Sequence, residues 1–108
     1  MGVFLGNLVI ANGAAPSTSL GGRLLRTIKS LTIHGPSALT NTVTLQSLDA
    51  VGGAAWTPVQ SGGADITITA AKALVVTDIP FGTIRVNSSG NEAAERTFPV
   101  WGEENPHQ

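Results

Sequence analysis

Apolar and polar residues alternate along several short stretches of this chain, a pattern typical of strands with one buried face and one exposed face. The clearest stretch is 65–69, where Ile66 and Ile68 alternate with polar residues. From this alternation we expect a buried face made of Ile66, Ile68, Ile84, Val86, Phe98 and Val100. No segment keeps apolar residues at helical spacing for more than a turn. Only 70–74 and 92–96 have a helix-prone composition, and both are short. The pattern therefore predicts an all-β fold.

The predicted strands are rich in Val, Ile and Thr and are separated by Gly, Pro and Asn residues. They lie at 3–11, 24–34, 42–48, 56–60, 65–69, 74–79, 83–87 and 97–101. About eight short strands at intervals of roughly ten residues predict an antiparallel β-sandwich with jelly-roll-like connections. Within 24–34 the apolar phase shifts between Ile28 and Leu31. A bulge or a change of sheet is therefore expected near Lys29 and Ser30.

A chain of 108 residues is expected to form one domain. We expect 1–23 to be an N-terminal arm, or a first strand followed by a loop, and 24–102 to be the β-sandwich domain. Residues 103–108 are polar and are expected to form a flexible tail. The links 12–22 and 49–55 are long enough to cross between two sheets.

Two parts of the chain contain candidate contacts for a partner. In the last predicted strand, Pro99 and Trp101 lie on the face opposite Phe98 and Val100. Because proline cannot donate to a ladder, 97–101 is expected to be an edge strand with an outward Trp101 that anchors a partner. Alternatively, a loop such as the first segment folds over this tryptophan. Together with the apolar start of the chain, this gives six candidate contact residues: Val3, Phe4, Leu5, Leu8, Pro99 and Trp101.

The chain carries little charge, with 12% charged residues and a formal net charge of −1, whereas an average protein has about 25% charged residues. No basic surface for phosphate is expected, so nucleic acid is not an expected partner. The low charge indicates either a surface covered by other protein or a merely neutral surface. No stretch approaches the roughly 20 apolar residues of a transmembrane helix, so no membrane partner is expected. No basic residue precedes Arg23, which does not fit a secretory signal.

Residue types that usually carry catalysis or bind metals are few. The chain has no cysteine, and its histidines, His34 and His107, are far apart. No nucleophile or acid lies at a diagnostic spacing from His34, and no Gly-x-Ser-x-Gly motif occurs. Glycine pairs such as Gly62-Gly63 predict turns rather than phosphate loops. We therefore expect no catalytic residue, no cofactor, no metal site and no enzymatic activity.

Residues 42–102 resemble a family of small all-β phage virion proteins. The resemblance is carried by strand and turn motifs: TVTLQ at 42–46, WTPV at 56–59, SGGADITIT at 61–69, IRVNSS at 84–89 and AERTFPV at 94–100. Members of this family are often capsid decoration (cement) proteins or other small head or tail components. The resemblance transfers no catalytic residue.

The resemblance implies a structural protein that binds the outside of a phage capsid and stabilises its lattice. The implied partners are the major capsid protein and further copies of the chain, with a trimer favoured over a dimer because a trimer fits threefold lattice sites. Such a protein is made in the host cytoplasm and lies on the virion surface. The alternatives are a phage tail or adaptor component and a carbohydrate-binding β-sandwich module.

Overall fold

A computed structural model of the protein describes residues 2–21, 28–48, 55–77 and 83–104, and the predicted all-β fold is confirmed. Within these ranges there are ten strands and no helix. The strands are β1 (Gly2–Ile10), β2 (Ile28–His34), β3 (Val43–Leu48), β4 (Trp56–Pro58), β5 (Gln60–Ser61), β6 (Ala64–Asp65), β7 (Thr67–Ile68), β8 (Ala73–Val76), β9 (Ile84–Ser88) and β10 (Arg96–Glu104). In the two helix-prone stretches, residues 70–72 and 92–95 form turns, bends and irregular backbone, and the remaining residues begin β8 and β10.

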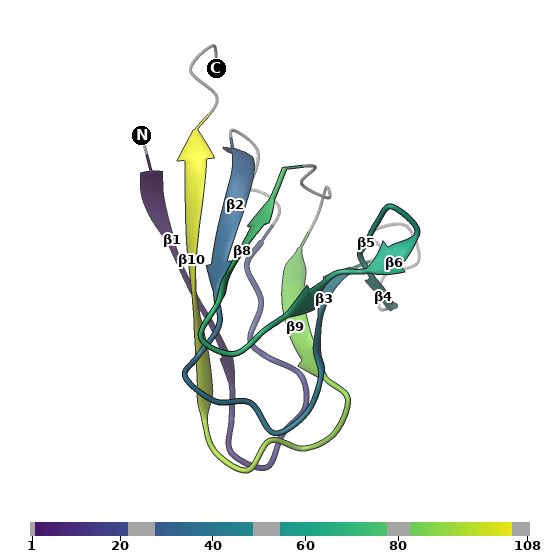
Figure 1. Ribbon diagram of the computed structural model, residues 1–108. Coiled ribbons are helices and arrows are strands. Elements are labelled where there is room, and N and C mark those ends of the chain that lie inside the picture. Colours follow the sequence, from purple (N-terminus) through teal and green to yellow (C-terminus); the bar gives the residue numbers. More distant parts are fainter. Residues whose placement is uncertain (1, 22–27, 49–54, 78–82, 105–108) are drawn as a thin grey trace.

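The strands form two main antiparallel sheets (Figure 1). Sheet A has the order β1-β10-β2-β8. In sheet B, β9 pairs with β3 along 43–47, while β4 and β7 pair with the two ends of β3. Since a strand has only two edges, β4 and β7 share the edge of β3 opposite β9. A small hairpin, β5-β6, turns at Gly62 and Gly63, whose φ angles of 63° and 85° fit a two-residue type I′ turn.

The core lies between the inward faces of sheets A and B. The expected inward residues Ile68, Ile84, Val86, Phe98 and Val100 are buried, and Ile66 is half-buried against the same cluster. The other buried apolar residues are Leu8, Ile10, Leu31, Ile33, Val43, Leu45 and Val76. Strand parity alone therefore predicted the inward faces of β7, β9 and β10.

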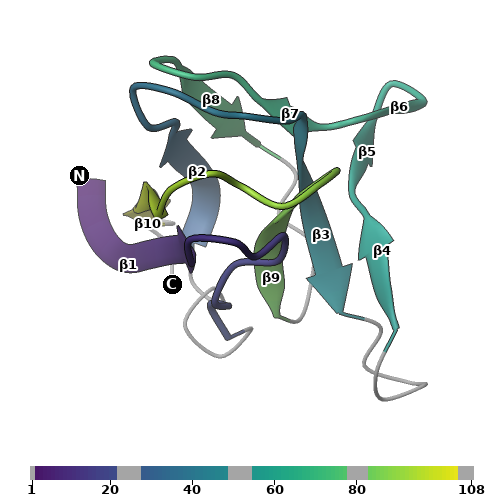
Figure 2. The same ribbon diagram turned by 90° about the horizontal axis from the view of Figure 1, so that it is seen from below.

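Residues 16–20 join the two sheets along one side (Figure 2). Ser17 donates its backbone N–H to the Val86 carbonyl oxygen at 2.9 Å, and Leu20 exchanges two backbone hydrogen bonds with Ile84 in β9. The same segment reaches β1, because Ser17 is also bridged to Ile10. The link 12–22 was expected to cross between the sheets, but the strands before and after it, β1 and β2, both belong to sheet A; its described part pairs with β9 of sheet B on the way. Most of 49–55 lies outside the described residues.

The prediction that 97–101 is an edge strand is wrong. β10 lies inside sheet A, with β1 on one edge and β2 on the other. Its ladder with β2 runs from Val100 to Glu104, so Pro99 lies one residue before that ladder begins and pairs only with Asn7 of β1. A proline fits inside the sheet at this point because β2 has no paired residue opposite it.

Of the two alternatives expected for the N-terminal segment, the described residues fit the strand followed by a loop. The N-terminal segment forms a strand: β1 pairs with β10 along nearly its whole length, and Leu8 and Ile10 belong to the core. At the other end, β10 continues through Glu103 and Glu104, two residues into the expected tail. Residues 105–108 lie outside the described part of the chain.

Two strands of sheet A contain irregularities. In the β10–β2 ladder, Glu103 is opposite Ser30 but Glu104 is opposite Ile28, which leaves Lys29 as the extra residue. The bulge predicted at Lys29 and Ser30 is thus confirmed. A second shift, not predicted, lies between Phe4 and Gly6 of β1, where Gly6 has a φ of 142°.

Gly35 allows a close approach between the ends of sheets A and B. It follows β2 and donates its N–H to the Lys72 carbonyl oxygen at 2.8 Å, and a Cβ at this position would collide with the backbone carbonyl oxygen of Thr69. We expect Gly35→Ala to lower the free energy of unfolding by about 1–3 kcal/mol, because rigid backbone rather than a mobile side chain must give way. Urea denaturation measures this change.

The matched control for this prediction is Gly21→Ala, because no atom of the described residues, its chain neighbours aside, lies within 4 Å of a Cβ added at Gly21 and its φ is not positive. Equal stability of the two variants would contradict the argument from close approach.

Candidate interaction surface

One row of outward side chains crosses all four strands of sheet A. The registers place Phe4 of β1 beside Trp101 of β10, Trp101 beside Thr32 of β2, and Thr32 beside Val75 of β8. These four residues are called the apolar row below. Phe4, Trp101 and Val75 are 50%, 43% and 61% exposed, and they are the large exposed hydrophobic residues of the described chain. Their alignment in one line makes the outer face of sheet A the strongest candidate for a binding surface.

The aromatic end of the apolar row is ordered by contact within the chain. The rings of Phe4 and Trp101 have centroids 5.2 Å apart and planes inclined at 59°, a favourable tilted arrangement. Beside them, Lys29 and Glu103 form an exposed ion pair with a nitrogen–oxygen distance of 3.2 Å. Such an exposed pair contributes little to the stability of the fold. It therefore places polar groups next to the apolar row without holding the two aromatic rings in position.

The structure separates the six predicted contact residues into three groups. Phe4 and Trp101 are exposed in the apolar row, and their contact with a partner stays a prediction. Val3, Leu5 and Pro99 are half-buried, with Leu5 packed against the core. Leu8 is fully buried opposite Phe98, so its prediction as a contact residue is corrected. The assignment failed because an apolar run alone does not reveal which face of β1 is inward.

Val75 is a fourth member of the apolar row that the sequence does not identify as exposed. Leu74, Val75 and Val76 read as a continuous apolar run, which hides strand parity. In β8, Leu74 and Val76 pair with the inward Ile33 and Leu31, so Val75 between them must point outward.

A buried carboxylate, Glu92, ties several loops together at one end of the sandwich. Its Oε1 accepts hydrogen bonds from the backbone N–H of Thr40 at 2.8 Å and from Nε of Arg96 at 3.0 Å. Its Oε2 accepts from the backbone N–H of Asn41 at 3.0 Å and from Oγ of Ser88 at 2.8 Å. We call these five residues the Glu92 clasp.

The electrostatics of the Glu92 clasp favour the ionised carboxylate. Burial by itself raises the pKa of Glu92, but the hydrogen bonds from Thr40, Ser88, Arg96 and Asn41 outweigh it and lower the pKa from 4.5 to about 2. The backbone of Glu92 also bonds to that of Gly13 and Ala14. Each buried polar side-chain atom of the Glu92 clasp has a hydrogen-bond partner within the chain, which indicates a structural role rather than a reactive one.

The outer face of sheet B contains the other tryptophan, Trp56. The guanidinium carbon of Arg85 lies 4.2 Å from the centre of the Trp56 ring, and Nε of Arg85 donates to Oε1 of Gln46 at 2.8 Å. Burial lowers the pKa of Arg85. One face of the Trp56 ring is thereby occupied, so this ring is a less available contact than Trp101.

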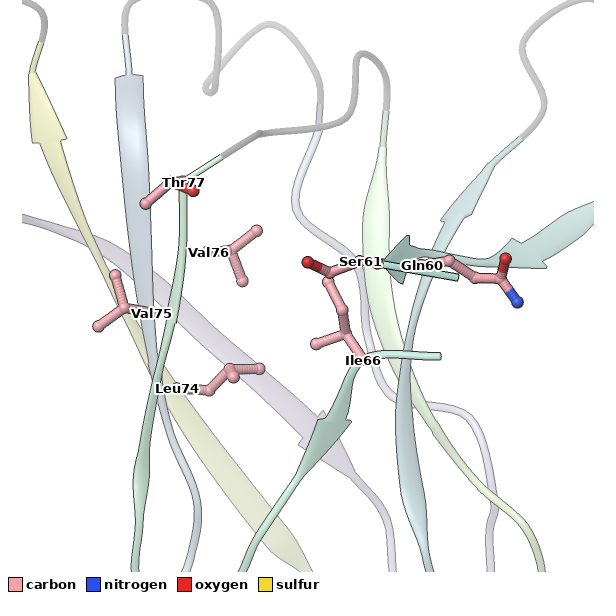
Figure 3. A pocket seen from close by; sticks show the side chains of 8 residues that line it. Gln60, Ser61, Ile66, Leu74, Val75, Val76 and Thr77 are labelled. Carbon is pink, nitrogen blue, oxygen red and sulfur yellow. The ribbon is translucent and has the colours of Figure 1, made fainter. Parts of the chain in front are cut away.

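A cavity of about 280 Å³ lies between β8 and the β5-β6 hairpin (Figure 3). Leu74 and Val76 point from β8 toward Ile66 and Ser61, whereas Val75 points to the other side. The described residues of its lining include no charged one. The cavity is smaller than the roughly 300–1,000 Å³ of typical small-molecule sites.

Comparison with known proteins gives no relative: the chain matches no protein-family model, no curated protein and no solved structure. Among the described residues, no group of three or more His, Cys, Asp or Glu is placed to hold a metal ion. The same part of the chain contains no helix long and apolar enough to span a membrane.

Proposed function

We propose that this chain is a structural virion protein that binds the outside of a phage capsid as a decoration protein and stabilises the capsid lattice. The observation that carries the proposal is the apolar row, which lines up the exposed large hydrophobic side chains of the described chain on the outer face of sheet A. The low content of charged residues and the motif resemblance of 42–102 to small phage virion proteins support it.

In this mechanism the protein acts by adhesion across joints between capsid subunits. Fully burying a Val, Phe or similar side chain stabilises a complex by about 1.5–3 kcal/mol before the costs of association are subtracted. One copy therefore contributes modest affinity through Phe4, Trp101 and Val75. A lattice that presents many joints, together with an oligomer that engages several at once, multiplies this affinity.

The proposal is tested with particles purified with and without the protein and imaged by electron microscopy. A regular lattice of added density on the head supports decoration. Density confined to the tail would favour a tail or adaptor component, and binding to a glycan array without particle binding would favour a carbohydrate-binding module.

The apolar row is tested with the double variant Phe4→Ala/Trp101→Ala. We expect its affinity for particles to fall at least about tenfold, because anchoring aromatic side chains carry a large share of interface energy. The matched control, Trp56→Ala, removes a tryptophan from the other sheet and is expected to bind as the unchanged chain does. Full occupancy by the double variant, with the fold intact by circular dichroism, would exclude the apolar row as the capsid contact.

A further inference from the structure

The two edge strands of sheet A are complementary in direction. Every neighbouring pair in the order β1-β10-β2-β8 is antiparallel, so β1 and β8 at opposite ends of the sheet run in opposite directions (Figure 1). When two copies are placed side by side in the same orientation, β8 of one copy meets β1 of the next as an antiparallel pair. The alternation of the sheet then continues across the boundary.

The edge formed by β8 lacks the features that usually prevent pairing, and the N-terminal half of β1 has one of them, the irregularity between Phe4 and Gly6. β8, Ala73–Val76, contains no charge and no proline, and its ladder with β2 has no bulge. Among the described residues, β8 pairs with β2 alone. The C-terminal half of β1 is covered where Thr18 donates to the Val9 carbonyl oxygen and Ser17 is bridged to Ile10. The described chain shows no such cover for the uncharged half at 2–6.

The cavity beside β8 fits the same arrangement. It is bordered by the inward Leu74 and Val76 at the edge of sheet A and by Ile66 and Ser61 on the other side. A strand added to β8 would place its own inward side chains over this space, whose described lining carries no charge. Val3 is such a residue, because it lies opposite the buried Gly102 on the inward face of β1 and is itself half-buried.

We propose that β8 of one copy pairs antiparallel with the N-terminal half of β1 of the next copy, in a head-to-tail oligomer. Val75 of one copy then lies beside Phe4 of its neighbour, and the apolar rows join into one continuous line. A twofold association through β8 alone would leave β1 of both copies uncovered, whereas head-to-tail pairing covers both kinds of edge and closes into a ring when its rotation permits. This inference rests on the proposed function only in taking the chain to be a homo-oligomer.

The absence of cysteine permits a direct test by disulfide cross-linking. Within one chain, Phe4 and Val75 lie three strand spacings apart, about 14 Å, which is too far for a disulfide. Two single variants, Phe4→Cys and Val75→Cys, are purified, mixed and mildly oxidised. We expect a disulfide-linked heterodimer as the main product, and little cross-linking of either variant alone. Native mass spectrometry of the unchanged chain is expected to show an oligomer.

Three results would overturn the proposal: homodimers of Val75→Cys alone, which indicate twofold pairing of β8; homodimers of Phe4→Cys alone; or a monomeric chain whose mixed variants do not cross-link. A folding control is provided by circular dichroism of both variants, whose substituted positions are at least half exposed. Particle binding is measured separately. An unchanged chain that does not bind particles, together with cross-linked heterodimers of the two variants, would contradict the proposed function and leave this interface standing. An unchanged chain that binds particles, together with variants that do not cross-link, would do the opposite.

Discussion

Replacing Glu92 with glutamine is expected to lower the free energy of unfolding by about 3–5 kcal/mol, the cost of breaking a buried ion pair by removing one partner. Both oxygens of Glu92 accept hydrogen bonds, and the glutamine amide nitrogen cannot accept any. Arg96, whose side chain is 15% exposed, also loses its counter-charge. Small domains are stable by about 5–15 kcal/mol, so this loss is a large share of the total.

Urea denaturation at neutral pH measures this effect, and Glu95→Gln is the matched control. Glu95 is the same residue type three positions along the chain, and it is exposed. Its replacement is expected to change the free energy of unfolding by less than about 0.5 kcal/mol. A Glu92→Gln variant as stable as the control would mean that the Glu92 clasp does not hold the loops together.

Acid is expected to weaken the same clasp reversibly. Because the pKa of Glu92 is about 2 in the folded chain and 4.5 ordinarily, the unfolded chain binds this proton more tightly. The stabilisation is therefore complete above the ordinary value and is lost as the pH falls through 4.5 toward 2. The shift corresponds to about 3 kcal/mol.

The measurement for this prediction is the free energy of unfolding in urea from pH 7 to pH 2.5, for the unchanged chain and for Glu92→Gln. Other carboxylates titrate in both proteins, so the difference between the two curves isolates Glu92. We expect this difference to shrink below pH 4.5. A constant difference across the whole range would show that the Glu92 carboxylate is not held ionised by the clasp.

Local sequence information was sufficient for strand positions and for most inward faces. The alternation around Ile68, Ile84 and Phe98 identifies the buried side of three strands, because side chains on a strand alternate with a period of two. The phase shift at Lys29 likewise marks a real bulge, since an extra residue must displace the alternation.

Long-range pairing could not be read in the same way. Pro99 suggested an edge strand, yet the structure accommodates it inside sheet A, where β2 ends on one side of β10. The local composition around Glu92 is helix-prone. Its role in the Glu92 clasp could not be predicted, because its partners Thr40 and Asn41 are 52 and 51 residues away along the chain. The sequence identified Phe4 and Trp101 of the apolar row but neither Thr32 nor Val75. Their alignment depends on the registers between four strands that are far apart in sequence.

The pairing of β1 with β10 also has a consequence for how the protein is made. β10 lies between β1 and β2, so two strands near the start of the chain have no neighbour in common until residues 96–104 have been synthesised. Sheet A therefore cannot be completed before β10 is made: β2 can pair with β8 earlier, but β1 stays without a partner in the sheet and with its apolar face exposed. Pairing β1 with β10 also closes a loop that contains all the strands between them, and contacts that close long loops form slowly. During translation, β1 is therefore the strand of sheet A that gains most from binding to a chaperone.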